Sequence, residues 1–161
     1  MTITFLQTGG TIDKDYPRST KGWAFEFGEP ACRRILEKLS PSFSFDIHTI
    51  CQKDSLEIND DDRQKMVDFI VQSPVQHLIL THGTDSLIET AQYLSVHLDQ
   101  QVIVLTGAMR PERFSNSDAS INLGLAIGAV QLLPKGVYIA MHGVVRTAQE
   151  ARRDSESGQF I

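Results

Sequence analysis

Two glycine turns that carry threonine have the clearest capacity for chemistry in this 161-residue chain. The first is Thr8-Gly-Gly-Thr-Ile12 and the second is Thr81-His-Gly-Thr-Asp85, and each directly follows a short apolar run. Glycine permits a positive φ and lets a ligand approach the backbone closely. Turn and helix-cap chemistry explains either motif alone, but the two together indicate one hydroxyl-lined site.

The polar groups of these turns suit a small zwitterion. A threonine hydroxyl is a weak nucleophile that needs a neighbouring base or a hydrogen-bonded phenol. Tyr16 follows Thr11 in the first turn, and Asp85 stands beside Thr84 in the second. Backbone N–H groups at helix N-termini favour anions, and the Asp85 carboxylate suits an ammonium group. Together these groups match the two charges of an α-amino acid.

An open α/β sheet would position both turns at one edge. Strand patterns fall at about residues 2–7, 43–47, 77–81, 102–106 and 137–141. Helical patterns fall between them, at about 30–39, 60–72, 85–98 and 118–133. This alternation predicts a three-layer α/β/α domain with a mostly parallel, flavodoxin- or Rossmann-like sheet. Ligands of such sheets bind beyond the carboxyl ends of the strands, where both threonine turns and Thr106-Gly107 are expected.

Several local features refine this expectation. Alternation of Phe43, Phe45 and Ile47 with polar residues predicts a half-exposed or edge strand. Residues 8–28 are expected to form a long polar loop, a kind of segment that often serves as a lid. Residues 142–161 are polar and show no clear period. Cys32, in a helical pattern, and Cys51, just after a strand, are expected to be buried free thiols.

Composition bounds the class of protein. The length fits one domain, and a net charge of −5 argues against nucleic acid as a partner. No apolar run approaches a membrane span and no secretory signal follows Met1, so we expect a cytoplasmic protein with no membrane partner. Nucleotide-binding glycine motifs are missing, and the histidines and cysteines lack zinc-site spacing. We therefore predict no metal and no cofactor.

At these residues the sequence resembles the bacterial-type L-asparaginase family, which includes the asparaginase-glutaminases. The matching segments are Thr8–Ile12, Thr81–Ala91, Val104–Pro111, Ser117-Asp-Ala and Asn122-Leu123. They span most of the chain in the family's order. The resemblance implies an asparaginase N-terminal-domain fold and hydrolysis of L-asparagine to L-aspartate and ammonia by a threonine-based amidohydrolase without a cofactor.

The resemblance also implies roles for individual catalytic residues. Thr11 matches the first catalytic threonine, Thr84 the second, and Asp85 its acidic partner. Tyr16 is the candidate for the tyrosine of the mobile first loop, at a shorter spacing than in long members. A gapless extension of the match puts Arg153 where the family has a catalytic lysine. Arginine can balance the charge of Asp85, but it does not readily accept a proton at neutral pH.

Substrate binding is implied at four positions. Ser55 matches the serine that helps to bind the α-carboxylate of the substrate, whereas the next residue, Leu56, replaces a glutamine of the secreted members. Gly10 and Gly83 would give the substrate close access to the backbone. Ala108 lies on the adjoining turn at a strand end.

The expected organisation is a single asparaginase-like domain over residues 1–161, without the carboxyl-terminal domain of the long members. A symmetric homo-oligomer, dimer or tetramer, could close the site with a neighbouring loop. Two alternatives stay open: an amino-acid-binding domain with little or no turnover, and an amidase component of a larger amidotransferase. The choice between asparagine, glutamine and other small amides also stays open, because one methylene changes binding by only about 1–3 kcal/mol.

Overall fold

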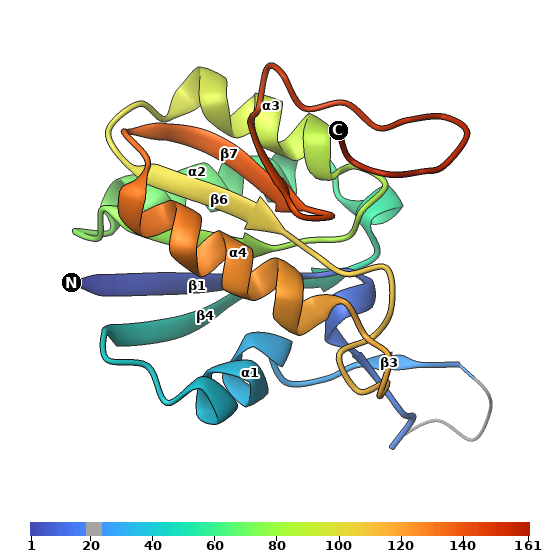
Figure 1. Cartoon of the computed structure of the whole chain (residues 1–161). Helices are drawn as coiled ribbons and strands as arrows, with labels where there is room; N and C mark the ends of the chain where they lie inside the picture. Colours follow the sequence, from blue (N-terminus) through green and yellow to red (C-terminus); the bar gives the residue numbers. More distant parts are fainter. Residues whose placement is uncertain (19–23) are drawn as a thin grey trace.

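The computed structural model describes residues 1–18 and 24–161 as a six-stranded sheet between helices (Figure 1). The strands of this sheet are β1 (Thr2–Gly9), β4 (Ser44–Lys53), β5 (His77–Thr81), β6 (Val102–Thr106), β7 (Gly136–Met141) and β8 (Val144–Thr147). Their spatial order is β4-β1-β5-β6-β7-β8, and only β8 runs antiparallel to its neighbour. The helices are α1 (Ala31–Leu39), α2 (Asp60–Gln72), α3 (Leu87–His97) and α4 (Ala119–Leu132). None of the helices described is long and apolar enough to cross a membrane.

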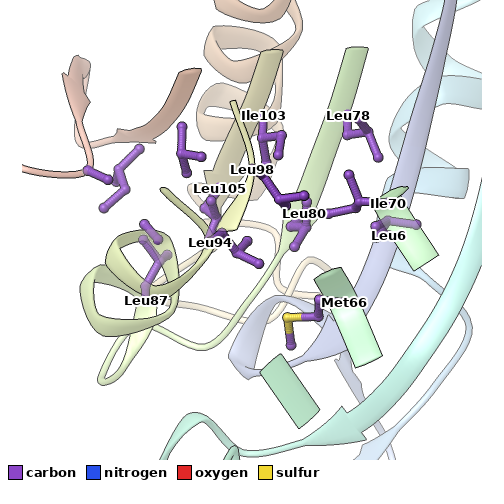
Figure 2. Packing of buried hydrophobic residues seen from close by; sticks show 14 of the residues in the cluster. Leu6, Met66, Ile70, Leu78, Leu80, Leu87, Leu94, Leu98, Ile103 and Leu105 are labelled. Atoms are coloured by element: carbon purple, nitrogen blue, oxygen red, sulfur yellow. The ribbon is translucent and has the colours of Figure 1, made fainter. Parts of the chain in front are cut away.

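Two apolar cores hold the helices to the sheet. Helices α2 and α3 cover one face, where Met66 and Leu94 pack against strand residues such as Leu80 (Figure 2). Helices α1 and α4 cover the other face, where Leu36 and Leu123 join the second core. Strand β6 is buried throughout, as expected for a central strand with helices on both sides. The three-layer α/β/α prediction is confirmed.

The strand order creates a switch point between β1 and β5. From β1 the chain crosses through α1 to β4 on one side, and it then returns to β5 on the other side. Ligand sites of open α/β sheets lie at this point, outside the carboxyl ends of the strands. The first threonine turn follows β1 and the second follows β5, so the topology puts both at the switch.

Local signals predicted most elements correctly. The bounds of α2, β5 and β6 agree with the expected ones, and the Asn59 side chain caps α2 by accepting a hydrogen bond from Asp62 N–H at 3.1 Å. Strand β4 lies at the edge of the sheet, as the alternation indicated. Phe43 and Ile47 pack partly against the core of α1 and α4, whereas Ser44 and Asp46 are exposed.

Other bounds were wrong. Strand β1 extends to Gly9 instead of ending near residue 7, because it keeps pairing with β4 through Gly9 and Lys53. Strand β4 likewise reaches Lys53, so Cys51 lies inside it, and that thiol is half-buried rather than buried; Cys32 is buried as expected. Helix α3 begins at Leu87 rather than near residue 85.

Two segments predicted as irregular contain strands. The expected loop 8–28 includes a short 3-10 helix, η1 (Thr11–Asp13), and a two-stranded sheet of β2 (Lys14–Asp15) and β3 (Glu26–Phe27); its residues 19–23 lie outside the described part. The polar segment 142–161 includes β8 and a bridge between Arg153 and Phe160. These strands have only two to four residues each, which is too few to give a periodic signal.

A buried carboxylate connects the first turn to α1. Asp13 has no exposed surface; it accepts a hydrogen bond from Ala31 N–H at 2.7 Å and one from the Thr81 hydroxyl at 3.3 Å. It therefore satisfies the N-terminus of α1 from a distant position in the sequence. Burial raises the pKa of Asp13 to about 6, against the opposing effect of these hydrogen bonds, a bond from Gln7 and the charge of Arg34.

We expect Asp13→Asn to change how the free energy of unfolding depends on pH. A folded-state pKa above the ordinary 3.8 means that this group contributes its stability below about pH 4 and loses it as pH rises through about 6. Relative to Asp13→Asn, the wild type should lose about 3 kcal/mol at most over this range. Urea unfolding at several pH values measures the difference, with the exposed Asp99→Asn as control. A wild-type-minus-variant difference that stays flat with pH would contradict the linkage.

Candidate active site

The two threonine turns touch through their glycines. Gly10 has a φ of +81°, in the region that favours glycine. Its N–H donates to the carbonyl oxygen of Lys53 at 2.9 Å. A Cβ on Gly10 would lie 2.3 Å from the backbone nitrogen of Gly83, so no larger residue fits between the turns. Thr11 and Thr84 each follow one of these glycines and therefore flank the contact.

A third segment closes on the second turn. It is the 3-10 helix η2 (Ser55–Glu57), which directly follows the end of β4. A Cβ on Gly83 would lie 2.6 Å from Ser55 Cβ and 2.9 Å from Ser55 Oγ. Ser55 is buried, and its carbonyl oxygen accepts a hydrogen bond from the Ser86 hydroxyl at 2.5 Å. The contact thus fixes Ser55 directly against the Gly83 backbone.

Ser55, Asp85 and Arg153 form a polar cluster beside this contact. The Ser55 hydroxyl accepts a hydrogen bond from Asp85 N–H at 3.2 Å and lies 3.5 Å from Asp85 Oδ2. Arg153 Nη1 donates to Asp85 Oδ1 at 3.2 Å and to the Thr84 carbonyl oxygen at 3.4 Å. Asp85 is about half exposed, so its carboxylate remains accessible to a small molecule.

The C-terminal part of the described chain delivers Arg153 to this cluster. The Arg153 guanidinium lies over the Phe160 ring, with Cζ 5.5 Å from its centroid, and Nε donates to the Gly158 carbonyl oxygen at 3.0 Å. Phe160 is buried in the core shared with α3, and its N–H donates to His142 Nδ1 at 3.0 Å. Arg153 is therefore anchored through a neighbour that packs in the core.

Thr11 and Thr84 are partly exposed residues. Neither side-chain hydroxyl makes a hydrogen bond to any residue in the described ranges 1–18 and 24–161. By contrast, the strand-end hydroxyls of Thr8 and Thr106 are buried and donate to the carbonyl oxygens of Thr81 and Ala140, both at 2.8 Å. The two turn threonines thus differ from their structural neighbours in being available to a ligand.

The turn after β6 is held by α4. A Cβ on Gly107 would lie 2.4 Å from the carbonyl oxygen of His82, so this turn also packs closely on the second threonine turn. Asn122 donates to the Gly107 carbonyl oxygen at 3.0 Å, and Asp118 accepts from Met109 N–H at 3.0 Å. Ala108 has its methyl group buried in the core of α1 and α4, which leaves only its backbone to face a ligand.

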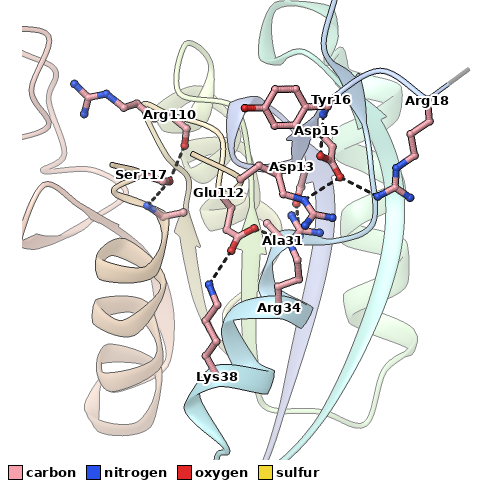
Figure 3. A network of polar contacts seen from close by, with 12 residues as sticks. Asp13, Asp15, Tyr16, Arg18, Ala31, Arg34, Lys38, Arg110, Glu112 and Ser117 are labelled. Atoms are coloured by element: carbon pink, nitrogen blue, oxygen red, sulfur yellow. Dashed lines mark hydrogen bonds and ion pairs between the residues drawn. The ribbon is translucent and has the colours of Figure 1, made fainter. Parts of the chain in front are cut away.

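Tyr16 lies apart from the polar cluster. Its ring is 59% exposed and packs with Phe25 and Phe114, at centroid distances of 5.6 and 6.4 Å. The neighbouring Asp15 accepts hydrogen bonds from Arg113 at 3.0 Å and from Arg18 at 3.4 Å (Figure 3). The first loop is therefore docked on the loop after β6 rather than on Thr11.

A buried ionic cluster reinforces this docking. Glu112, on the loop after β6, is 2.6 Å from Arg34 Nε and 3.5 Å from Lys38 Nζ of α1 (Figure 3). Glu112 N–H also donates to the carbonyl oxygen of Ile12 at 3.2 Å. Burial alone would raise the pKa of the adjacent Asp15, but the Tyr16 N–H and the Arg113 guanidinium lower it below its ordinary value. The loops on this side of the site are thus held by charge pairs.

The structure therefore brings together most of the predicted site residues. Those at the junction of the turns are Gly10, Thr11, Ser55, Gly83, Thr84, Asp85 and Arg153. Sequence reasoning gave no role to Arg63 and Thr90, which lie behind His82. The signal that could have indicated Arg63 is its position in line with the apolar stripe of α2, which continues at Met66, Val67 and Ile70. Within the described residues, no group of three histidine, cysteine, aspartate or glutamate side chains is arranged to hold a metal ion.

Fold and site together define a class: a doubly wound α/β domain with a hydroxyl-lined site at its switch point. Residues 2–158 match the family model "Asparaginase, N-terminal", so the chain belongs to the asparaginase family. The probable periplasmic L-asparaginase of Haemophilus influenzae is 28% identical over 162 residues, which cover 95% of this chain and 46% of that protein. A glutamyl-tRNA(Gln) amidotransferase component of Methanococcus vannielii is 37% identical over 76 residues, covering 47% of this chain and 18% of that protein.

Solved structures share the fold. The thermostable L-asparaginase from Thermococcus kodakarensis superimposes with a TM-score of 0.87 at 24% identity, covering 100% of this chain and 51% of that one. A probable cytoplasmic L-asparaginase from Campylobacter jejuni gives a TM-score of 0.77 at 24% identity, covering 98% and 52%. The chain spans about half the length of these proteins and of the Haemophilus relative.

The close packing at Gly83 gives a direct test of the junction. Because a Cβ would collide with Ser55, we expect Gly83→Ala to destabilise the fold by about 1–3 kcal/mol. Gly128→Ala, on the exposed side of α4, meets nothing within 4 Å and should stabilise the helix by about 0.5–1 kcal/mol. Chemical denaturation of both variants measures the two effects. Equal behaviour of the two variants would contradict the contact.

Proposed function

We propose that this chain hydrolyses the side-chain amide of L-asparagine, giving L-aspartate and ammonia. The observation that carries the proposal is the contact of the two threonine turns beside the Ser55–Asp85–Arg153 cluster. Two unbonded hydroxyls, a buried serine and a half-exposed carboxylate meet at one point of the sheet. This donor and acceptor set suits a zwitterion that carries a reactive amide.

The proposed chemistry starts at Thr11. Its oxygen attacks the amide carbon while its proton leaves to a base, and backbone N–H groups of the glycine turns stabilise the oxyanion. The C–N bond then breaks as the nitrogen takes up a proton, which releases ammonia and leaves a β-acyl ester. Water, oriented by Thr84 and Asp85, adds to this ester and frees aspartate and Thr11. Direct attack by water, with both threonines as stabilisers, gives the same products.

The rest of the cluster would bind the α-carboxylate and the ammonium group of the substrate. Ser55 Oγ is proposed to bind the α-carboxylate, and the Asp85 carboxylate the ammonium group. Gly10, Gly83 and the backbone at Ala108 would line the approach. Holding both charges fixes the amide relative to the threonines, and such positioning contributes a large part of enzymatic rate.

Tyr16 is proposed as the phenol that assists Thr11. Its ring packs on Phe25 and Phe114, so the role requires the first loop to shift toward Thr11 when substrate binds. We also propose that residues 1–161 work as one domain within a homo-oligomer. A cytoplasmic location is proposed as well, in line with the similar Campylobacter protein.

Two substitutions test the roles of the threonines. We expect Thr11→Ala and Thr84→Val each to lower kcat for L-asparagine at least about a hundredfold, because each removes a hydroxyl that acts in the transition state. Thr2→Val, at the opposite end of β1, is the matched control. A coupled ammonia assay measures all three variants. Full ammonia release by either turn variant would refute its assignment.

Arg153 is proposed to act as a fixed positive charge on Asp85. Under this proposal, Arg153→Met should lower kcat/KM about tenfold or more by leaving Asp85 unbalanced, whereas Arg153→Lys should stay within about threefold of the wild type. The same ammonia assay compares the two variants. A methionine variant as active as the wild type would remove Arg153 from the proposed site.

Two alternatives make different predictions for the same assay. An amino-acid-binding domain would bind L-aspartate in calorimetry and release no ammonia at high protein concentration. The similarity to an amidotransferase component favours a second possibility, an amidase that needs another protein chain. Such a component would be inactive alone, so steady ammonia release by the isolated chain supports the asparaginase proposal over both. Parallel assays with D-asparagine and L-glutamine define the substrate.

A further inference from the structure

A buried chain of polar groups runs from α2 to the second threonine turn. Arg63 of α2 is 4% exposed, and its Nε lies 3.2 Å from the Thr90 hydroxyl of α3. Thr90 Oγ1 lies 3.0 Å from His82 Nε2, and His82 Nδ1 lies 2.8 Å from the carbonyl oxygen of Gly83. Thr90 and His82 have no exposed surface. Four groups therefore connect in series without water.

The chemistry of these groups permits one direction for the hydrogen bonds. A carbonyl oxygen can only accept, so His82 carries its proton on Nδ1 and donates it to the Gly83 carbonyl. The unprotonated Nε2 then accepts a hydrogen bond from the Thr90 hydroxyl. A guanidinium has donors only, so Arg63 Nε–H donates to the Thr90 oxygen. The Gly83 carbonyl thus selects the imidazole tautomer, and Thr90 together with Arg63 holds the opposite side of the ring.

The electrostatic surroundings keep this imidazole neutral. Burial lowers the pKa of His82 to about 4; the Gly83 carbonyl opposes this effect, and the positive charge of Arg63 adds to it. Arg63 is itself held by Asp60, at 2.8 Å from Nη1, and by Glu89, at 3.1 Å from Nη2. Two exposed carboxylates therefore hold the outer nitrogens of the buried guanidinium, while its Nε faces Thr90.

The last group of this hydrogen-bonded series is the Gly83 carbonyl, which belongs to the peptide bond between Gly83 and Thr84. A trans peptide bond is planar, so its C=O and N–H point in opposite directions. Tethering the Gly83 carbonyl to the buried imidazole therefore aims the Thr84 N–H away from the core. That N–H makes no hydrogen bond to any other part of the described chain.

We propose that Arg63 is a positioning residue that acts through Thr90 and His82 to hold the Gly83–Thr84 peptide in its reactive orientation. Its effect on turnover rests on the proposed function, since Thr84 is there a catalytic group. The hydrogen bonds of the His82 ring do not depend on any activity. The two consequences can therefore be measured separately.

The first measurement is ¹⁵N NMR of the histidine rings in the full chain. Wild-type His82 should be in the Nδ1–H tautomer. Thr90→Val removes the hydroxyl that donates to Nε2 and should shift the Nε2 resonance toward that of an imidazole nitrogen without a hydrogen bond, whereas Thr90→Ser should keep the wild-type spectrum. Arg63→Lys, which has no side-chain N–H at the position of Nε, should shift the Nε2 resonance in the same direction and provides a second variant if the valine variant folds poorly. Ser95→Ala, also on α3, is the control.

The second measurement is the kcat and KM for L-asparagine of the same variants. Loss of the tether should lower kcat about tenfold or more for Thr90→Val and Arg63→Lys with KM within about threefold, and Thr90→Ser should restore kcat. Wild-type His82 in the Nε2–H form, or variants with the wild-type Nε2 resonance and kcat, would overturn the proposal. If the wild type releases no ammonia while the Nε2 resonances change as expected, the proposed function fails and the positioning of His82 by Thr90 and Arg63 stands.

Discussion

The contact between the backbones of Gly10 and Gly83 is the constraint on which the site depends. Strands β1 and β5 are neighbours, and their chains leave the sheet toward different helices at the switch point. Without a side chain on either glycine, the two turns approach until backbone meets backbone, and Ser55 fills the remaining side. Three segments that are far apart in the sequence thus present their hydroxyls within one small region. Close packing of this kind transmits small displacements instead of absorbing them.

The site turns are outside regular secondary structure, and buried polar side chains fix their positions instead. Asp13 connects the first turn to α1, Asn122 holds the turn after β6 to α4, and His82 connects the second turn to α3. In each case a side chain bonds a backbone group, of Ala31, Gly107 or Gly83, that would otherwise have no partner in a strand or helix. Buried polar groups of this kind must be fully satisfied to be stable, so the helices and the site turns depend on one another.

Much of the fold could be predicted because its signals are local. The apolar run of β6, the Asn59 cap and the alternation in β4 are each readable from neighbouring residues. Strand β8 and the pairing of β2 with β3 could not be predicted, because their pairing depends on distant backbone rather than on a periodic pattern. The junction of the threonine turns followed from motif and topology together. Arg63 and Thr90 were missed because their importance arises only when α2 and α3 lie side by side.

The placement of Arg153 has a consequence for how the protein acquires its site during folding. Its guanidinium reaches Asp85 through a segment anchored by Phe160, while the opposing turn begins at the end of β1. Every contact of the junction is therefore non-local, and contacts of this kind form late because loop-closure entropy must be overcome first. Helices can form early, but the cores and the junction are complete only when both distant segments have docked. The site therefore exists only when the whole native topology has formed. Partly folded forms that keep much of the native helix would lack it.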